Sequence, residues 1–349
     1  MKGIVFVGDR KLELQEFPDP TPGPNEVVLE IKASGMCGSD LKFYRAPAGE
    51  GMKMFGFKDA TPKIAGHEPC GVVVAVGSNV NPKQAYVGQR AMVHHYRGCG
   101  ACPHCSTGWQ QMCVEGVAEV YGVTGHGAHA MYMKCPANTI VDLREELSFE
   151  TGAAIACGTG TAWGALHRLQ VTGDQTVAIF GQGPVGLSAT QLAVAMGARV
   201  IALDVSDERL ARAKEFGADE VINPSKTDAV AAIRQLTHGL GAHASIDSSS
   251  SPDARRQSVQ CVRSWGKACF VGEGGTVTID VSQDMLRRQV TVMGSWTFST
   301  VGQKACNDFI ADRKINVDGL FTHRWTLEQG DEAYKVFDQQ TSGKGVFLM

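Results

Sequence analysis

The chain changes its pattern of hydrophobic and polar positions twice along its length. Residues 1–150 contain short β-type runs such as 26–31 (EVVLEI) and 71–76 (GVVVAV), with glycine, proline and other turn residues between them. Short runs of this kind predict an irregular, mostly antiparallel β region. After about residue 296 the character becomes mixed again, and the closing GVFLM predicts a final strand.

Between residues 151 and 295 short apolar runs alternate with helical periods. The chain passes in order through TVAIF, VGLSATQLAVAMGA, RVIALD and DERLARAKEFGA, and continues with the strand-like runs ASIDS, KACFVG and QVTVMGS. Buried strands that alternate with helices indicate βαβ units and a parallel sheet. The pattern therefore predicts an α/β protein in which one domain (1–150 and 296–349) is interrupted by a second (151–295) with a doubly wound parallel sheet.

The composition limits location and partners. The 349 residues suffice for two domains, and 43% hydrophobic with 20% charged residues is ordinary for a soluble globular protein. A formal net charge of -3 gives no electrostatic footprint for nucleic acid or an anionic membrane. No stretch approaches the roughly 20 apolar residues of a membrane helix, and the first residues lack the apolar segment of a signal peptide. We therefore expect a cytoplasmic protein without nucleic-acid or membrane partners.

A glycine-rich turn, GQGPVG at residues 181–186, follows the predicted strand 176–180 and opens a helix. In this G-x-G-x-x-G pattern Gly181 permits a tight turn, Gly183 lets a pyrophosphate approach the backbone, and Gly186 allows close packing of helix on strand. The N–H groups of the helix N-terminus then face the phosphates. A glycine turn without a ligand is the competing interpretation, and the strand and helix around it favour a dinucleotide site.

The strand 199–203 ends in Asp204. A carboxylate there can accept hydrogen bonds from both ribose hydroxyls of the adenosine half, and it would repel a 2′-phosphate, so NAD is predicted rather than NADP. Arg209 lies where a guanidinium could cover the adenine face, and an ordinary solvated helix residue is its alternative interpretation.

Four of the eleven cysteines, Cys99, Cys102, Cys105 and Cys113, stand within a short segment rich in glycine and proline. Four thiolates that converge on one Zn²⁺ leave no open position, so such a site is structural. Two disulfides, a [4Fe–4S] cluster or a nucleic-acid-binding zinc ribbon are the alternatives. The expected reducing compartment, the lack of an electron-transfer partner site and the few basic residues nearby make structural zinc the preferred hypothesis.

Three separated segments carry further candidate metal ligands: Cys37 in MCGSD, His67 with Glu68 in GHEP, and Cys157 in ACGTGT. Each alone has a plain explanation, because buried free cysteines and satisfied core histidines are common. Together with a cofactor site they fit a catalytic zinc with two cysteines, one histidine and an open fourth position, which suits alcohol oxidation.

Nearly the whole chain resembles the zinc-containing medium-chain dehydrogenase/reductase family of alcohol, polyol and threonine dehydrogenases. The motifs that carry the resemblance are MCGSDLKFY (36–44), GHEPCGVVVAVG (66–77), the four-cysteine lobe, ACGTGTAWGAL (156–166), GQGPVG and the strand before Asp204. The resemblance implies a split, GroES-like catalytic domain around a Rossmann nucleotide-binding domain, with the active site in the cleft between them. It also implies a homodimer or homotetramer, with 289–295 as an edge strand at the subunit interface.

The resemblance assigns residue roles in turn. It makes Cys37, His67 and Cys157 the catalytic zinc ligands, Glu68 a carboxylate beside the metal, and Asp40 the acceptor that orients the ligating histidine. The cofactor contacts that it and the glycine motif imply are Thr161, Gly181, Gly183, Pro184, Val185, Gly186, Asp204, Arg209, Val271 and Ser295. The expected reaction moves a hydride between a secondary alcohol, diol or polyol and NAD, giving a ketone or aldehyde.

Ser39, two residues after Cys37, is placed to accept the proton of the alcohol and pass it toward the cofactor ribose, whereas a hydroxyl that caps a turn is its plain alternative. Many relatives carry a histidine five residues after the first ligand, and this chain has Lys42 there. An unperturbed lysine, with a pKa of about 10.4, is a poor proton shuttle near neutrality. A depressed pKa of Lys42, a water molecule, or His94 or His95 could complete the route.

The substrate itself is not fixed by these motifs. The stretch 44–63, with Met52, Met54, Phe55 and Phe57, is expected to be a loop near the pocket or an ordinary packed surface loop; His95 and Trp296 could also line the pocket. Two other hypotheses compete with a zinc alcohol dehydrogenase. One is a zinc-free quinone or enone reductase of the same fold, and the other is a non-catalytic cofactor-binding protein.

Overall fold

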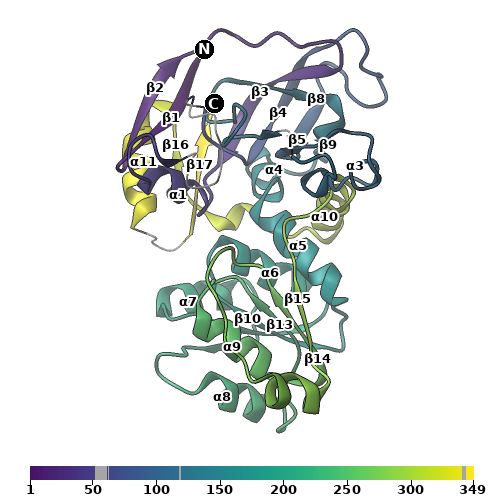
Figure 1. Cartoon of the computed structure of the whole chain (residues 1–349), viewed down its shortest axis with the longest axis vertical. Coiled ribbons are helices and arrows are strands. Elements are labelled where there is room, and N and C mark those ends of the chain that lie inside the picture. Colours follow the sequence, from purple (N-terminus) through teal and green to yellow (C-terminus); the bar gives the residue numbers. More distant parts are fainter. Residues whose placement is uncertain (52–60, 62, 118, 340–342) are drawn as a thin grey trace. The chain divides into compact units, whose positions relative to one another are not determined.

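The computed structural model describes residues 1–51, 61, 63–117, 119–339 and 343–349. The chain forms two compact units (Figure 1). Unit 1 comprises Met1–Cys157, Phe298–Asp312 and Asn316–Met349, and unit 2 comprises Gly158–Thr297 and Arg313–Ile315. The α/β class predicted from the sequence is confirmed. None of the helices in the described part of the chain is long and apolar enough to cross a membrane.

Unit 1 is built on a mixed sheet with the strand order β16-β17-β3-β4-β5-β9, in which β8 also pairs with β3. All its pairings are antiparallel except that of β16 with β17. Two small antiparallel pairs, β1-β2 and β6-β7, complete the predicted irregular β region. The strands are β1 (Lys2–Gly8), β2 (Lys11–Glu16), β3 (Glu26–Gly35), β4 (Pro69–Val76), β5 (Arg90–Val93), β6 (Tyr96–Arg97), β7 (Glu119–Val120), β8 (Tyr132–Pro136), β9 (Ile140–Asp142), β16 (Phe321–Trp325) and β17 (Lys344–Leu348).

The helices of unit 1 are short or lie in the returning C-terminal segments. Most of α4 was expected in the second domain, but this helix packs against β3 and β4 and belongs to unit 1. Its N-terminus is capped by Ser148, whose hydroxyl accepts the N–H of Thr151. The helices are α1 (Asp40–Arg45), α3 (Pro103–Ser106), α4 (Phe149–Ile155), α10 (Thr300–Arg313) and α11 (Gly330–Asp338), with 3₁₀ turns at Gln110–Met112, Ala137–Thr139, Asp318–Leu320 and Leu327–Gln329.

The described residues of unit 1 include two large hydrophobic clusters. One is formed by the inward residues of β3, β4 and β5, such as Leu29, Val73 and Ala91. The other joins the N- and C-terminal segments, because Ile4 packs with Tyr334 of α11 and other residues from both ends of the chain. This second cluster places α1 and α11 beside the end of β3.

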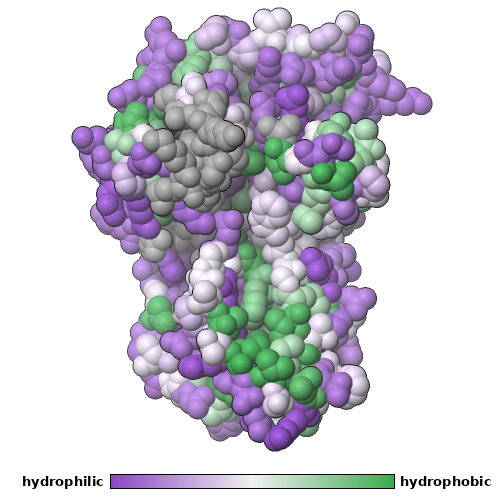
Figure 2. All heavy atoms as spheres, viewed as in Figure 1, coloured by the Kyte–Doolittle hydropathy of each residue, from purple (hydrophilic) through white to green (hydrophobic). Residues whose placement is uncertain are grey.

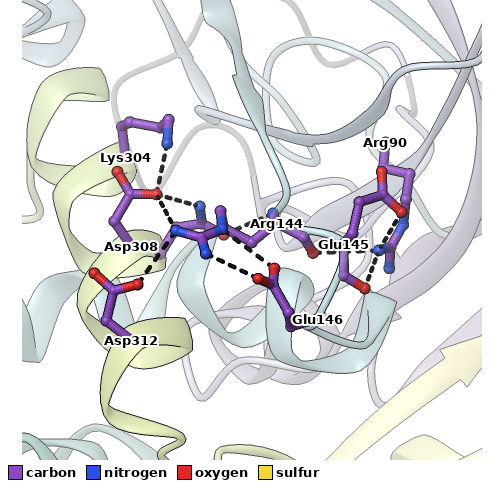
Figure 3. A network of polar contacts seen from close by, with 8 residues as sticks. Arg90, Arg144, Glu145, Glu146, Lys304, Asp308 and Asp312 are labelled. Atoms are coloured by element: carbon purple, nitrogen blue, oxygen red, sulfur yellow. Dashed lines mark hydrogen bonds and ion pairs between the residues drawn. The ribbon is translucent and has the colours of Figure 1, made fainter.

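A polar network also attaches the returning helix α10 to the first part of unit 1 (Figure 3). Arg144, after β9, donates to Glu146 over 2.9 Å and lies 3.4 Å from Asp312 on α10. Exposed ion pairs contribute little singly, and a shared network such as this one contributes more through its fixed geometry. The other labelled members are Arg90, Glu145, Lys304 and Asp308.

Unit 2 is a six-stranded, wholly parallel sheet with the strand order β12-β11-β10-β13-β14-β15. This confirms the predicted doubly wound sheet, whose order reverses between β10 and β13. The expected edge strand is β15. The strands are β10 (Thr176–Phe180), β11 (Arg199–Leu203), β12 (Glu220–Ile222), β13 (Ala242–Asp247), β14 (Val262–Phe270) and β15 (Thr291–Gly294).

Helices cover this sheet, and the carboxyl ends of β10 and β13 meet at the switch in strand order, where ligands bind in doubly wound folds. Every residue of β10 is buried, as expected for a central parallel strand. The helices are α5 (Gly158–Leu169), α6 (Pro184–Ala195), α7 (Asp207–Glu215), α8 (Ala229–Leu236) and α9 (Pro252–Gln260), with short helical turns at Val281–Met285 and Leu286–Arg288.

Candidate functional site

Four potential metal ligands converge in unit 1. Cys37 follows β3, His67 and Glu68 immediately precede β4, and Cys157 follows α4. Because β3 and β4 are antiparallel neighbours, the end of one lies beside the start of the other, and the N–H of Gly35 donates to the carbonyl of Glu68. One donor atom from each of the four ligand residues lies within 4.8 Å of all the others. The structure thus brings together the three segments that the sequence singled out.

The two thiols at this site are close but not bonded to each other. Cys37 Sγ lies 3.9 Å from Cys157 Sγ, far beyond the roughly 2.05 Å of a disulfide. The hydrogen bond from Cys157 holds the pKa of Cys37 well below its ordinary value, against the effect of burial. A thiolate, a second thiol and an imidazole in one buried cluster are the donor set that Zn²⁺ prefers.

His67 presents one ring nitrogen to the cluster and the other to Asp40. Its Nδ1 lies 2.9 Å from Asp40 Oδ1, and its Nε2 lies 3.2 Å from Ser39 Oγ. Burial alone would lower the pKa of His67, but the Asp40 carboxylate and the Cys37 thiolate outweigh it and raise the pKa well above its ordinary value. With Nδ1 committed to Asp40, Nε2 is the nitrogen that could bind a metal.

Glu68 is wholly buried and lies against Lys344 of β17. Its Oε2 lies 2.5 Å from Lys344 Nζ, which also donates to the carbonyl of Met36 over 2.9 Å. Within the described part of the chain, Glu68 Oε1 has no hydrogen-bond partner. A side chain at Gly35 would collide with this carboxylate, so a larger residue there would force Glu68 to move. An unpartnered buried carboxylate oxygen beside two thiols is consistent with a metal site.

Ser39 directs its hydroxyl at the cluster and not at the helix that follows. It is the N-cap residue of α1, but its side chain makes no capping hydrogen bond and lies 3.2 Å from His67 Nε2. Lys42 is half-buried on the same helix.

The two histidines proposed as substitutes for Lys42 are both buried. His94 Nε2 lies 3.4 Å from Gln111 Oε1. His95 Nδ1 lies 2.9 Å from the carbonyl of Ala156, and its ring centroid is 5.3 Å from that of His67. Only His95 therefore lies beside the cluster.

The four cysteines of the lobe also converge. Cys99 Sγ lies 4.0 Å from Cys105 Sγ, and Cys102 Sγ lies 4.0 Å from Cys113 Sγ. These separations are close to the roughly 3.8 Å edge of a tetrahedron with 2.3 Å zinc–sulfur bonds. Backbone N–H groups donate to the sulfurs, and those of Cys105 and Val114 lower the pKa of Cys102 to about 6. The lobe is therefore shaped to bind one metal ion through four thiolates, with no coordination position left open.

The glycine-rich turn of unit 2 has the backbone that a phosphate site requires. Gly181 has φ +87°, and a side chain at Gly186 would overlap the carbonyl of Gly181. A side chain at Gly183 would meet nothing within 4 Å, so this position leaves open space in front of α6. The first N–H groups of α6 receive no side-chain cap. This is the arrangement in which a helix N-terminus accepts a pyrophosphate.

Asp204 lies at the carboxyl end of β11, beside this turn. The N–H of Gln182 donates to its Oδ2 over 2.7 Å and the N–H of Ser206 donates to its Oδ1 over 2.9 Å. The two contacts fix the carboxylate and leave acceptor capacity for hydroxyl groups. Arg209, on α7, has its guanidinium 3.8 Å from Asp204 Oδ2.

The remaining expected cofactor contacts lie in unit 2. Val271 directly follows β14 and Ser295 directly follows β15, so both stand at the carboxyl edge of the sheet. Thr161 is half-buried on α5, which is joined to α6 by a 2.9 Å hydrogen bond between Thr159 and Ser188.

The chain matches two family models, an alcohol dehydrogenase GroES-like domain over residues 23–145 and a zinc-binding dehydrogenase over residues 184–312. An uncharacterized zinc-type alcohol dehydrogenase-like protein of Escherichia coli (strain K12), YphC, is 36% identical over 99% of this chain and 98% of its own length. The chain belongs to the zinc-containing medium-chain dehydrogenase/reductase family.

Two further likenesses agree with this membership. The L-threonine 3-dehydrogenase of Symbiobacterium thermophilum is 31% identical to this medium-chain dehydrogenase, over 97% of this chain and 96% of that protein. The structure of galactitol-1-phosphate dehydrogenase from Escherichia coli superposes with a TM-score of 0.88 at 27% identity, and the match covers 100% of both chains. The predicted fold, GroES-like and Rossmann-like, is thereby confirmed.

Some site residues of this medium-chain dehydrogenase escaped the sequence analysis, and one expected set lies outside the described residues. Lys344 was missed because it stands alone in the final strand, and no local motif marks it. Tyr334 and His129, which lie behind Asp40, were missed for the same reason. The expected pocket loop residues Met52, Met54, Phe55 and Phe57 are not among the residues that the structure describes.

Proposed function

We propose that the protein is a zinc-dependent oxidoreductase that transfers a hydride between an alcohol and NAD, giving a ketone or aldehyde. The observation that carries the proposal is the convergence of Cys37, His67 and Cys157 with Glu68 in one buried cluster. Membership of a zinc-binding dehydrogenase family supports it. The substrate class is a secondary alcohol, a diol or a polyol.

In this proposal Cys37, His67 and Cys157 hold the catalytic zinc. A zinc ion there supplies Lewis acidity, which lowers the pKa of an alcohol hydroxyl and polarises a carbonyl. Asp40 keeps the His67 ring in the tautomer that offers Nε2. Ser39 would accept the hydroxyl proton while passing its own hydroxyl proton toward the ribose of the cofactor; its Oγ lies beside His67 Nε2 and caps no helix. A bound NAD would accept the hydride from the carbon that carries the hydroxyl group, and this carbon would become the carbonyl carbon.

The proposed cofactor is NAD rather than NADP. Support comes from Asp204, which two backbone N–H groups fix beside the glycine turn. A 2′-phosphate would meet this carboxylate at close range, whereas ribose hydroxyls can donate to it. Arg209, whose guanidinium lies 3.8 Å from Asp204 Oδ2, is proposed to cover the adenine.

The four-cysteine lobe is proposed to hold a second, structural zinc. Four sulfurs leave no coordination position for a substrate, so the ion would fix the fold of the segment.

None of the eleven cysteines, all of which the structure describes, forms a disulfide. This supports the proposed cytoplasmic location, because free thiols persist in a reducing compartment.

We also propose that the protein is a homodimer or homotetramer that associates through unit 2. The strand β15 is at the edge of the sheet and offers unpaired backbone groups to a second copy. Figure 2 shows hydrophobic side chains gathered on unit 2 where β14 and β15 lie. Exposed apolar residues here include Trp265 of β14 and, in the helical turns between β14 and β15, Val281 and Leu286. Their burial against a second copy would remove a patch that is unusual on a monomer.

Metal analysis and a substrate panel test the proposal. The purified protein should contain two zinc ions per chain, and Cys157→Ser should contain one. The panel pairs secondary alcohols, diols and polyols with NAD⁺ and NADP⁺, and the matching ketones with NADH. If the protein contains no zinc and reduces enones with NADPH, the quinone or enone reductase hypothesis would replace the proposal. Turnover with no member of the panel would favour a cofactor-binding protein.

A further inference from the structure

Behind Asp40, buried side chains form a chain of hydrogen bonds. Tyr334 donates its hydroxyl hydrogen to Asp40 Oδ2 over 3.3 Å. His129 Nε2 lies 2.8 Å from the Tyr334 hydroxyl oxygen, and Ser34 Oγ lies 2.7 Å from His129 Nδ1. All four side chains are buried. At its other end the chain reaches the metal cluster, because Asp40 Oδ1 lies 2.9 Å from His67 Nδ1.

The direction of each hydrogen bond follows from the chemistry of Asp40. An ionised carboxylate only accepts, so Tyr334 must donate its single hydrogen to Asp40. The tyrosine oxygen can then only accept from His129, which places the ring hydrogen on Nε2. Burial lowers the pKa of His129 to about 4, so this ring is neutral and its Nδ1 accepts the Ser34 hydroxyl hydrogen. Every donor therefore points toward Asp40.

Asp40 is held at both oxygens and connects two candidate ligands. Its Oδ2 accepts the N–H of Cys37 over 2.9 Å as well as the Tyr334 hydroxyl. Its Oδ1 faces His67 Nδ1. The hydrogen bonds to Oδ2 set the plane of the carboxylate, and this plane decides how Oδ1 meets the imidazole. A rotation of the carboxylate would disturb both the His67 ring and the turn that carries Cys37.

The anchor of this arrangement is rigid. The Tyr334 ring packs edge-on against Phe6 with 4.8 Å between centroids and lies 5.4 Å from the ring of Tyr44. His129 packs edge-on against Phe347 at 4.7 Å. These contacts fix both rings from three segments of unit 1 that are far apart in the sequence. The hydroxyl of Tyr334 is thus held in a fixed position beside Asp40.

We propose that Tyr334, oriented by His129, is a positioning residue for the catalytic metal. It fixes the Asp40 carboxylate and, through it, the tautomer and ring orientation of His67. The inference rests on the proposed function in taking His67 as a zinc ligand. Outer hydrogen-bond partners of metal-bound histidines have measurable effects on metal affinity, because they hold the imidazole in its binding geometry.

A purely structural role is the competing explanation, since a buried tyrosine needs some partner for its hydroxyl. The variant Tyr334→Phe keeps the ring and removes only the hydroxyl. It also leaves His129 Nε2–H without an acceptor, which destabilises the fold by itself. The double variant Tyr334→Phe/His129→Phe removes the tyrosine hydroxyl and the imidazole together, and only the small Ser34 hydroxyl then loses its acceptor. It should recover stability while Asp40 still lacks its donor.

The test measures zinc release from the full-length protein to a chelator, together with the visible spectrum of the cobalt-substituted protein. In Tyr334→Phe the catalytic zinc should be held about 10- to 100-fold less tightly, and the cobalt bands should shift. The four-cysteine lobe should keep its zinc and serves as the internal control. Tyr44→Phe, the same change in the same cluster, should behave as wild type.

Each outcome decides between the two roles. If zinc retention and the cobalt spectrum of Tyr334→Phe both equal those of wild type, the inference is overturned. Equal loss of both zincs, or recovery of zinc retention along with stability in the double variant, would show a structural role and also overturn it. The inference is supported if the double variant regains stability but still releases its catalytic zinc more easily than wild type. His67→Ala distinguishes failure of this inference from failure of the proposed function. An unaltered zinc content in that variant would refute His67 as a ligand and with it the proposed function.

Discussion

The Lys344 ammonium lies 2.5 Å from Glu68 Oε2, and neither side chain is exposed to solvent. Burial alone would lower the pKa of Lys344, but Glu68 and the Cys37 thiolate outweigh it and raise the pKa. Lys344 therefore remains a cation inside the protein. It stands in the last strand, whose register with β3 (Val346 opposite Gly35) brings it to the candidate metal cluster. Among the described residues, the C-terminal strand thus supplies the lysine that forms an ion pair with Glu68.

Removal of this cation should make unit 1 easier to unfold. In Lys344→Met the buried Glu68 loses its partner, and because burial raises the pKa of Glu68 to about 8 the carboxyl should then take up a proton, so the free energy of unfolding should fall by about 1–3 kcal/mol. Thermal and urea unfolding measure the change. Lys344→Arg keeps the charge and is the matched control, and Lys344→Met/Glu68→Gln should recover much of the loss. Equal stability of the Met and Arg variants would mean that the ion pair is not what holds this strand.

The lobe should lose its zinc independently of the catalytic cluster. Cys102→Ser removes one of four sulfurs from a closed site, and we expect the zinc content to fall from two ions per chain to one. The remaining ion should stay bound and the protein should be less stable to heat, because metal binding contributes to the folding of such segments. Cys135→Ser, at a buried cysteine outside both clusters, should retain two. Retention of two ions in Cys102→Ser would contradict a structural zinc.

The parts of the site that the sequence predicted are those with a local cause. The turn 181–186 needs only a strand, three glycines and a helix in succession, and these lie within one continuous segment. The lobe is equally local, because its sulfurs and its flexible residues are neighbours in the chain. Cys37, His67 and Cys157 are further apart; their residue types, taken with the cofactor motif, suggest a catalytic zinc, and the resemblance to a known family is what assigns each of them as a ligand.

Lys344, Tyr334 and His129 could not be predicted in this way. Their positions at the site depend on the pairing of β17 with β3 and on the packing of α11 against the N-terminal segment. A lysine between two glycines and a tyrosine on an amphipathic helix look like ordinary surface and core residues in the sequence. Their role follows only from long-range contacts, which leave no periodic signal. The domain boundary near α4 depends on long-range contacts in the same way, since α4 packs against β3 and β4.

Removal of the Asp204 carboxylate should change the cofactor preference. In Asp204→Ala a 2′-phosphate no longer meets a negative charge, so the ratio of kcat/KM for NADP to that for NAD should rise about tenfold or more, which corresponds to roughly 1.4 kcal/mol. Steady-state kinetics with both cofactors give this ratio. Asp207→Ala, which removes an exposed carboxylate on α7, is the control and should leave the ratio unchanged. No shift in Asp204→Ala would refute the role given to this residue.

Ser39 and Lys42 should differ in their effect on the reaction. Ser39→Ala removes the group proposed to take the hydroxyl proton, and kcat should fall by about 10²-fold or more with little change in KM. Ser39→Thr, which keeps a hydroxyl, should retain much of the activity. Lys42→Ala should shift the pH–rate profile if the lysine continues the proton route. An unaltered profile and rate would remove Lys42 from that route and leave the step to water.

The buried His94 should make the protein less stable in acid. Burial lowers its pKa to about 4, whereas an unfolded histidine titrates near 6.5. Below about pH 6.5 the unfolded chain therefore binds a proton that the folded chain does not, and the stability that the neutral ring provides is lost progressively down to about pH 4. Replacement by a residue that does not titrate should flatten this part of the stability curve. His94→Gln should accordingly lose less in apparent Tm between pH 7 and 4.5 than wild type, and His238→Gln, at an exposed histidine, should follow wild type. Parallel curves for His94→Gln and wild type would show that His94 takes up its proton equally in the folded and unfolded chains.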